Sequence, residues 1–140
     1  MKTLVVSAVS IVLVSISFCP MVMAAPSIPD DVQMVQPDPS LPKELSAFFG
    51  KWQGIDSREE FFVIVEKIDK ESAGLYFWRT GNPSMGSPGW VRVKAQVIEE
   101  RGKYKLRFRG RFGTSEFTLR GERLDWTSPP SFSVVLTRVP

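Results

Sequence analysis

Apolar and polar side chains alternate almost without a break through residues 89–109, "GWVRVKAQVIEERGKYKLRFR". Because successive side chains of an extended chain point to opposite faces, this pattern predicts two β-strands, each with one buried face and one solvated face. The Arg-Gly pair at 101–102 interrupts the alternation and is typical of a tight turn between antiparallel neighbours. The segment therefore predicts a β-hairpin.

Short apolar runs of the same kind fill the chain from residue 51 to residue 139, with further Arg-Gly pairs at 109–110 and 120–121. The predicted strands are 51–55, 60–68, 73–80, 89–100, 103–109, 114–120, 123–127 and 132–139. Eight short antiparallel strands close readily into a barrel, since closure leaves no exposed sheet edge. We therefore expect an all-β fold, an eight-stranded antiparallel up-and-down barrel. One or two turns of helix, ending at Gly50, should precede it.

The first 24 residues have the pattern of a secretory signal peptide. Lys2 precedes an apolar run at 4–18, and the small residues of "VMA" at 22–24 fit cleavage after Ala24. An uncleaved signal-anchor is the alternative, because the apolar stretch is close to the length of a membrane span. We expect an exported protein, periplasmic or secreted, with no transmembrane span after cleavage; the alternative is a membrane-tethered one.

Residues 25–42 combine five prolines and three aspartates with few large apolar side chains. This composition disfavours both helices and strand ladders. We predict a Pro-rich disordered tether between the signal peptide and a barrel domain at 43–140.

Histidine is absent from the sequence, and the single cysteine, Cys19, lies within the predicted signal peptide. A mature chain would therefore lack the commonest general base, a thiolate nucleophile and the usual zinc ligands. The sequence also contains no phosphate-binding loop or EF-hand loop. We expect a protein that is not an enzyme and that holds no metal and no cofactor.

A short helix that leads into Gly50-Lys51-Trp52 on the first strand of an eight-stranded meander resembles the lipocalin-like (calycin) β-barrels, which include the fatty-acid-binding proteins. The resemblance implies that Trp52 closes one end of the barrel and packs against a basic residue late in the last strand. Arg138 is such a residue, on the same face of its strand as Leu136, and a cation over an indole ring contributes about 0.5–2 kcal/mol. The chain departs from many lipocalins in its shorter domain and in having no helix after the last strand.

An unusual stretch at 74–90 places aromatic side chains on both sides of a loop rich in Gly, Pro and Ser. Long loops at a barrel mouth often control ligand entry, so our first expectation is a small apolar or amphipathic ligand bound in the lumen. The candidate lumen and mouth residues are Tyr76, Trp78, Met85, Trp90, Tyr104 and Phe108. The alternative is a solid core, because eight strands leave room only for side chains or for one small ligand.

Charge is divided unevenly along the chain. Residues 26–71 hold five basic and ten acidic residues (net −5), whereas 72–140 hold twelve basic and five acidic residues (net +7). The outward positions of two neighbouring strands predict a basic face made of Arg92, Lys94, Lys103, Lys105, Arg107 and Arg109. Our second expectation is thus an envelope or extracellular interaction module with a solid core, with an inhibitor as one form of it, that binds an anionic macromolecule or membrane surface.

Nucleic acid is the partner that this face fits least, since no aromatic side chain is interleaved with its basic residues. A solvated sheet face that prevents aggregation is the simpler alternative to a binding surface.

Overall fold

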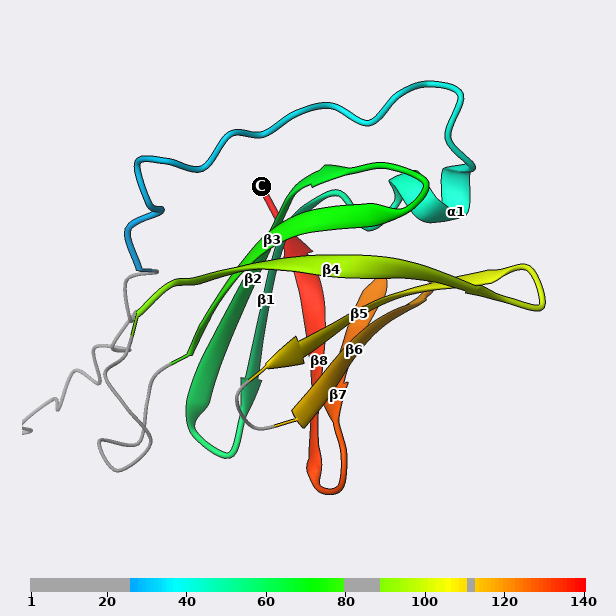
Figure 1. The fold of residues 1–140 in the computed structure, drawn as a ribbon. Helices are drawn as coiled ribbons and strands as arrows, with labels where there is room; N and C mark the ends of the chain where they lie inside the picture. Colours follow the sequence, from blue (N-terminus) through cyan, green and yellow to red (C-terminus); the bar gives the residue numbers. More distant parts are fainter. Residues whose placement is uncertain (1–25, 80–88, 111–112) are drawn as a thin grey trace, which may run out of the picture.

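All eight predicted strands are present, and they form a closed antiparallel barrel in chain order (Figure 1). The computed structural model describes residues 26–79, 89–110 and 113–140. The strands are β1 (Gly50–Asp56), β2 (Glu59–Ile68), β3 (Ser72–Arg79), β4 (Val91–Glu100), β5 (Lys103–Gly110), β6 (Gly113–Arg120), β7 (Arg123–Ser128) and β8 (Phe132–Val139). Each strand pairs with the next, and β8 pairs with β1 to close the barrel. The predicted up-and-down barrel is confirmed, while the predicted signal peptide lies outside the described residues.

Two of the hairpin turns have the backbone twist that joins antiparallel strands tightly. Ser57 and Arg58 connect β1 to β2 with φ angles of 48° and 75°, and Arg101 and Gly102 connect β4 to β5 with φ angles of 55° and 75°. Two successive positive φ values are the mark of the type I′ turn, whose twist matches that of the flanking strands. The turn expected from the Arg-Gly pair at 101–102 is therefore present.

One turn of helix, α1 (Lys43–Ser46), leads into the barrel. Pro42 stands immediately before it, and its carbonyl accepts hydrogen bonds from the N–H groups of Leu45 and Ser46. Leu45 and Phe48 are each only 1 % exposed, so this turn closes one end of the barrel with apolar side chains. Within 26–79, 89–110 and 113–140, no helix has the length and apolarity needed to cross a membrane.

The interior of the barrel is filled by aromatic and aliphatic side chains. The ring of Trp126 lies 5.8 Å from that of Phe61, 5.3 Å from Phe77 and 5.2 Å from Phe117, measured between centroids. Phe108 stacks on Phe77 at 5.6 Å and on Phe117 at 5.9 Å. Centroid distances of about 5–6 Å between rings are typical of a close-packed protein core. These side chains therefore fill the lumen.

Residues 26–40, here called the strap, run in an extended path over the outside of the barrel before reaching α1 (Figure 1). The Trp90 indole donates a hydrogen bond to the carbonyl oxygen of Ser27 (2.9 Å), and the N–H of Val35 donates to the carbonyl oxygen of Glu66 (2.7 Å). The prediction of a disordered tether thus fails for the strap. The prediction rested on the low content of large apolar side chains. The strap is held instead by hydrogen bonds to the barrel, which composition does not reveal.

Candidate functional site

The predicted contact at the closed end of the barrel is present. The Arg138 guanidinium lies 4.2 Å above the centre of the Trp52 ring, and the Trp52 indole donates a hydrogen bond to the carbonyl of Phe48 (3.0 Å). Arg138 also donates to the carbonyls of Phe49 and Ala47, both at 2.6 Å. These carbonyls follow α1, where backbone acceptors have no partner within the helix. Arg138 therefore binds the end of α1 and the indole together. It lies opposite Trp52 in the β1–β8 ladder, on the face that the sequence predicts, and as a residue it is exposed.

Gly50 has the space and the backbone conformation that this arrangement requires. Its φ is +128°, and a Cβ at this position would lie 2.5 Å from a terminal nitrogen of Arg138. Any side chain here would strain the backbone and push the guanidinium away. The Gly-x-Trp spacing thus has a physical basis: the glycine admits the arginine that covers the tryptophan.

The six residues predicted to line the lumen or its mouth are divided by the structure. Tyr104 and Phe108 do face the interior, where they are part of the packed core or lie against it. Tyr76, Trp78 and Trp90 instead lie on the outer surface of the barrel. Their contacts are to the strap and to Phe62, with ring centroids of Trp78 and Trp90 at 5.4 and 6.5 Å from that ring.

The physical reason is strand parity. Residues 76–78 are three aromatics in a row, so the sequence does not reveal which of them point inward, and Phe77 is the one packed in the lumen. Met85 lies outside the described residues. Among the described residues of the stretch 74–90, no aromatic side chain lines an open lumen.

The predicted basic face is partly neutralised by acidic residues from neighbouring strands. The Arg107 guanidinium pairs with Glu116 of β6 at 2.6 Å, and the Lys105 ammonium pairs with Glu100 at 2.9 Å and with Glu116 at 3.7 Å. These contacts raise the pKa of Lys105 and lower the pKa of Glu100, because each charge stabilises the other. Lys103 lies opposite Glu100 on the hairpin. The half of the face nearest the β4–β5 turn is therefore mixed in charge.

The basic residues of this face that have no ion pair among the described residues include Lys94 and Arg109, which lie in the other half, where the barrel wall opens. β4 and β5 pair only from Gln96 opposite Arg107 to Glu100 opposite Lys103, so residues 91–95 of β4 pair with β3 alone. Residues 108–110 of β5 likewise pair with β6 alone. We call the resulting gap between the two strands the β4–β5 opening.

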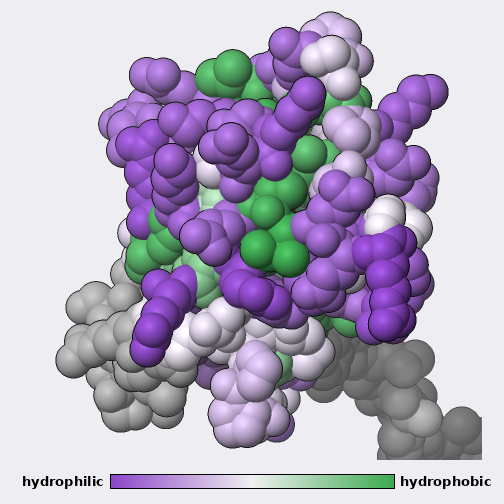
Figure 2. Space-filling view, turned by 45° about the vertical axis from the view of Figure 1, so that its right-hand side comes forward, coloured by the Kyte–Doolittle hydropathy of each residue, from purple (hydrophilic) through white to green (hydrophobic). Residues whose placement is uncertain are grey.

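A hollow of ≈ 230 Å³ lies in the β4–β5 opening. Its lining residues are Lys94, Gln96, Arg107, Phe108, Arg109 and Thr114. Lys94 and Arg109 form no ion pair with the residues that the structure describes. Three basic side chains and one aromatic residue thus line the same hollow. Figure 2 brings the β4–β5 hairpin side forward and shows hydrophobic side chains among hydrophilic ones on this side of the molecule.

A second hollow, of ≈ 480 Å³, lies at the other end of the molecule between the strap and the β2–β3 turn. Its polar walls include Asp38, Asp69 and Glu71 together with Lys70. Hydrogen bonds from the N–H groups of Glu71 and Ser72 lower the pKa of Asp69, so this carboxylate already serves the turn. Across 26–79, 89–110 and 113–140, no group of three or more acidic, His or Cys side chains is placed to hold a metal ion.

In comparisons with known proteins, no family model matches the sequence, and no curated protein or solved structure matches it. The class of protein that the structure defines is therefore a closed eight-stranded antiparallel barrel, which agrees with a lipocalin-like fold at the level of architecture.

Proposed function

We propose that this chain is an exported interaction domain, built on a calycin-like barrel with a solid core, that binds an anionic membrane surface through the β4–β5 opening. The observation that carries the proposal is that Lys94 and Arg109, which have no ion pair among the described residues, line one hollow together with Phe108 and with Arg107, the partner of Glu116. A phospholipid headgroup offers a phosphate to such cations and apolar groups to the aromatic ring in the same hollow. The closed end, with Trp52 under Arg138, supports the calycin-like assignment.

This proposal is preferred over a ligand held in the lumen because of what occupies the lumen. Trp126, Phe117 and the other packed rings take the volume that a small apolar ligand would need. Tyr76, Trp78 and Trp90, which the first expectation relied on, contact the strap or the outer face.

The experiment is a vesicle-binding assay with the full chain, comparing phosphatidylcholine vesicles with and without phosphatidylglycerol. The double variant Lys94→Gln, Arg109→Gln removes the two rim cations that have no ion pair among the described residues. Each basic residue near an anionic surface contributes about 1 kcal/mol, so binding should weaken about 10- to 30-fold. Lys43→Gln, an exposed lysine of α1, is the matched control and should change binding little.

Added salt should weaken binding of the parent chain, because the Debye length shrinks to about 3 Å at 1 M salt. Glu116→Gln should have the opposite effect from the double variant and tighten binding, since it releases Arg107 from its partner. If Lys43→Gln, which removes one charge, lost half of the binding free energy that the double variant loses by removing two, net charge and not the opening would govern binding.

A further inference from the structure

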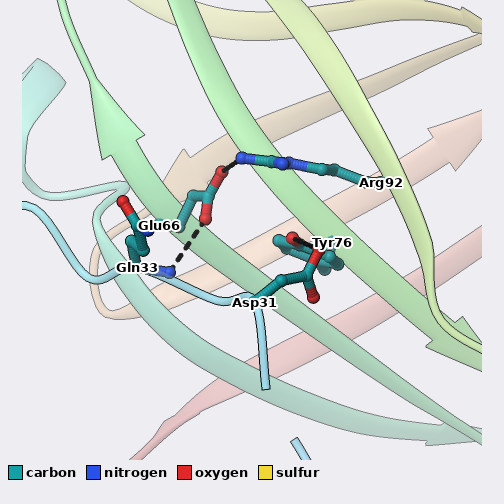
Figure 3. Close-up of polar contacts among 5 residues, drawn as sticks. All are labelled: Asp31, Gln33, Glu66, Tyr76 and Arg92. Atoms are coloured by element: carbon teal, nitrogen blue, oxygen red, sulfur yellow. Dashed lines mark hydrogen bonds and ion pairs between the residues drawn. The ribbon is translucent and has the colours of Figure 1, made fainter. Parts of the chain in front are cut away.

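The outside of the barrel beneath the strap carries a cluster of polar groups that contact the strap. Its central residue is Glu66, whose side chain is only 1 % exposed although it lies on the outer face of β2. One carboxylate oxygen pairs with Arg92 at 2.7 Å, and the other accepts a hydrogen bond from the N–H of Gln33 at 3.1 Å (Figure 3). A buried carboxylate is costly unless its oxygens are bonded, and here the strap supplies one of the two bonds.

The barrel is shaped locally to present this carboxylate. The β2–β3 register shifts between Val65 and Lys67, and such a bulge turns the side chain of the extra residue in a new direction. Gly74 on β3 leaves the necessary room, because a Cβ there would lie 3.0 Å from a carboxylate oxygen of Glu66. The bulge in β2 and the space at Gly74 therefore determine the position of the Glu66 carboxylate.

Three further groups on the barrel point polar atoms at the strap. The Tyr76 hydroxyl donates a hydrogen bond to the carboxylate of Asp31 at 2.9 Å (Figure 3), and the Trp90 indole donates to the Ser27 carbonyl. The carbonyl of Glu66 accepts from Val35. Burial and the contact with Asp31 raise the pKa of Tyr76, which keeps its hydroxyl protonated as a donor. We call Glu66, Tyr76 and Trp90, with Arg92 behind them, the strap site.

The strap site contacts the strap mostly through main-chain groups of the strap. The strap contributes the carbonyl of Ser27 and the N–H groups of Gln33 and Val35, and only Asp31 takes part through a side chain. Three of the strap's apolar side chains contribute little burial, while Val32 is half-buried. Their exposed fractions are 46 % for Ile28, 40 % for Met34 and 52 % for Val35.

A surface that binds backbone groups can accept another extended segment that has its donors and acceptors at the same spacing. Because the strap buries little apolar area through Ile28, Met34 and Val35, a competing segment can replace it. We propose that the strap site binds an extended segment of a partner protein, one with an acidic residue two positions before the residue whose N–H meets Glu66, and that the strap is its intramolecular competitor. Because the strap is tethered, its effective concentration is in the millimolar range for a short linker, and a partner must exceed it in affinity.

The test uses the full chain and a fluorescent peptide with the sequence of residues 26–36 as the probe. Gln33→Pro in the protein removes the N–H that bonds Glu66 and should free the site. Met34→Pro is the matched control, because the N–H of Met34 has no partner among the described contacts. A hydrogen bond to a charged group shifts an equilibrium about 10- to 100-fold, and a more populated open state raises apparent affinity in proportion. The Gln33→Pro protein should therefore bind the peptide at least about fivefold more tightly than the parent and Met34→Pro proteins.

The peptide contact that defines the partner is tested by a pair of changes. Asp31→Ala in the peptide should weaken binding to the Gln33→Pro protein, and it should have no further effect once Tyr76→Phe is also present in the protein. Asp31→Asn in the chain is a milder opening variant and serves if Gln33→Pro does not fold. Equal peptide affinity of the opened and parent proteins, or binding that ignores the Asp31–Tyr76 pair, would overturn the proposal. Dimers that exchange straps without capturing peptide would likewise overturn it, in favour of a second copy as occupant.

Discussion

Replacing Gly50 with alanine is the sharpest test of how the closed end is built. Gly50 has a φ of +128°, and an added Cβ would lie 2.5 Å from a terminal nitrogen of Arg138. The atom that must yield is the end of a flexible side chain, so the guanidinium will move before the backbone does. The expected result is a folded barrel in which Arg138 has left the Trp52 ring and the carbonyls of Phe49 and Ala47.

The magnitude has two parts. Alanine in this region of backbone conformation costs about 1–3 kcal/mol. Loss of the cation–π contact, held at 4.2 Å, costs about 0.5 kcal/mol at an exposed site, and the two hydrogen bonds from Arg138 add about 0.5 kcal/mol each. The free energy of unfolding should therefore fall by about 2.5–4.5 kcal/mol, of which about 1.5 kcal/mol passes through Arg138.

The assay is urea unfolding followed by far-ultraviolet circular dichroism in a double-mutant cycle of Gly50→Ala with Arg138→Met. If the glycine acts partly through the arginine, Gly50→Ala should cost about 1.5 kcal/mol less in the Arg138→Met background. The same cost in both backgrounds would refute the reasoning, because it would reduce the role of Gly50 to its backbone conformation alone.

Further changes test the core, the closed end and the acid stability of the fold. Trp52→Ala should lower the free energy of unfolding by about 3–5 kcal/mol, and a loss below about 1 kcal/mol in urea unfolding would remove its closing role. The Trp126 indole nitrogen is buried without a hydrogen-bond partner in the described part of the chain, so Trp126→Phe should cost far less than the about 3–5 kcal/mol of Trp126→Ala; similar costs would contradict a lumen filled by packing. The pKa of Asp69 is lowered in the folded state, so its stabilising contribution is complete above its ordinary value of 3.8 and is lost as the pH falls through the lowered value. The stability difference between the parent and Asp69→Asn proteins should accordingly shrink in acid unfolding below that pH, and a difference that persists unchanged would contradict the assignment.

The strands were predictable because the alternation that defines them is local. Residues 91–97 and 103–109 carry one buried and one wet face, which fixes both the element and the parity of its side chains. At 76–78 three aromatics follow one another and the parity is ambiguous, so Tyr76 and Trp78 were assigned to the wrong face. The closed end was predictable for a different reason, since the resemblance to calycin barrels implies that a basic residue late in the last strand packs against the tryptophan of Gly-x-Trp.

The charge pattern of the candidate site was only half predictable. Which cations are free depends on the register between strands, and alternation within one strand does not determine it. Glu116 lies on β6 directly opposite Arg107, and this pairing neutralises the middle of the predicted basic face. The β4–β5 opening could not be seen in the sequence either, because it arises where a ladder ends between two regular strands. A hint existed in the outward parity of Glu116 within 114–120, beside a strand rich in arginine and lysine.

The composition of the strap did not predict its contacts with the barrel. The sequence of β2 nevertheless indicates that part of its outer face is covered. Residues 61–65, "FFVIV", are apolar at every position, and such continuous runs are typical of strands buried on both faces. Phe61, Val63 and Val65 point into the core, so Phe62 and Ile64 must be covered from outside, and both are indeed buried at 6 % and 2 % exposure. An unalternating strand in an otherwise alternating barrel therefore locates the outer surface that another segment has to occupy. This is the same surface on which Glu66 meets the strap, so the continuous apolar run at 61–65 and the buried carboxylate mark one covered face of β2.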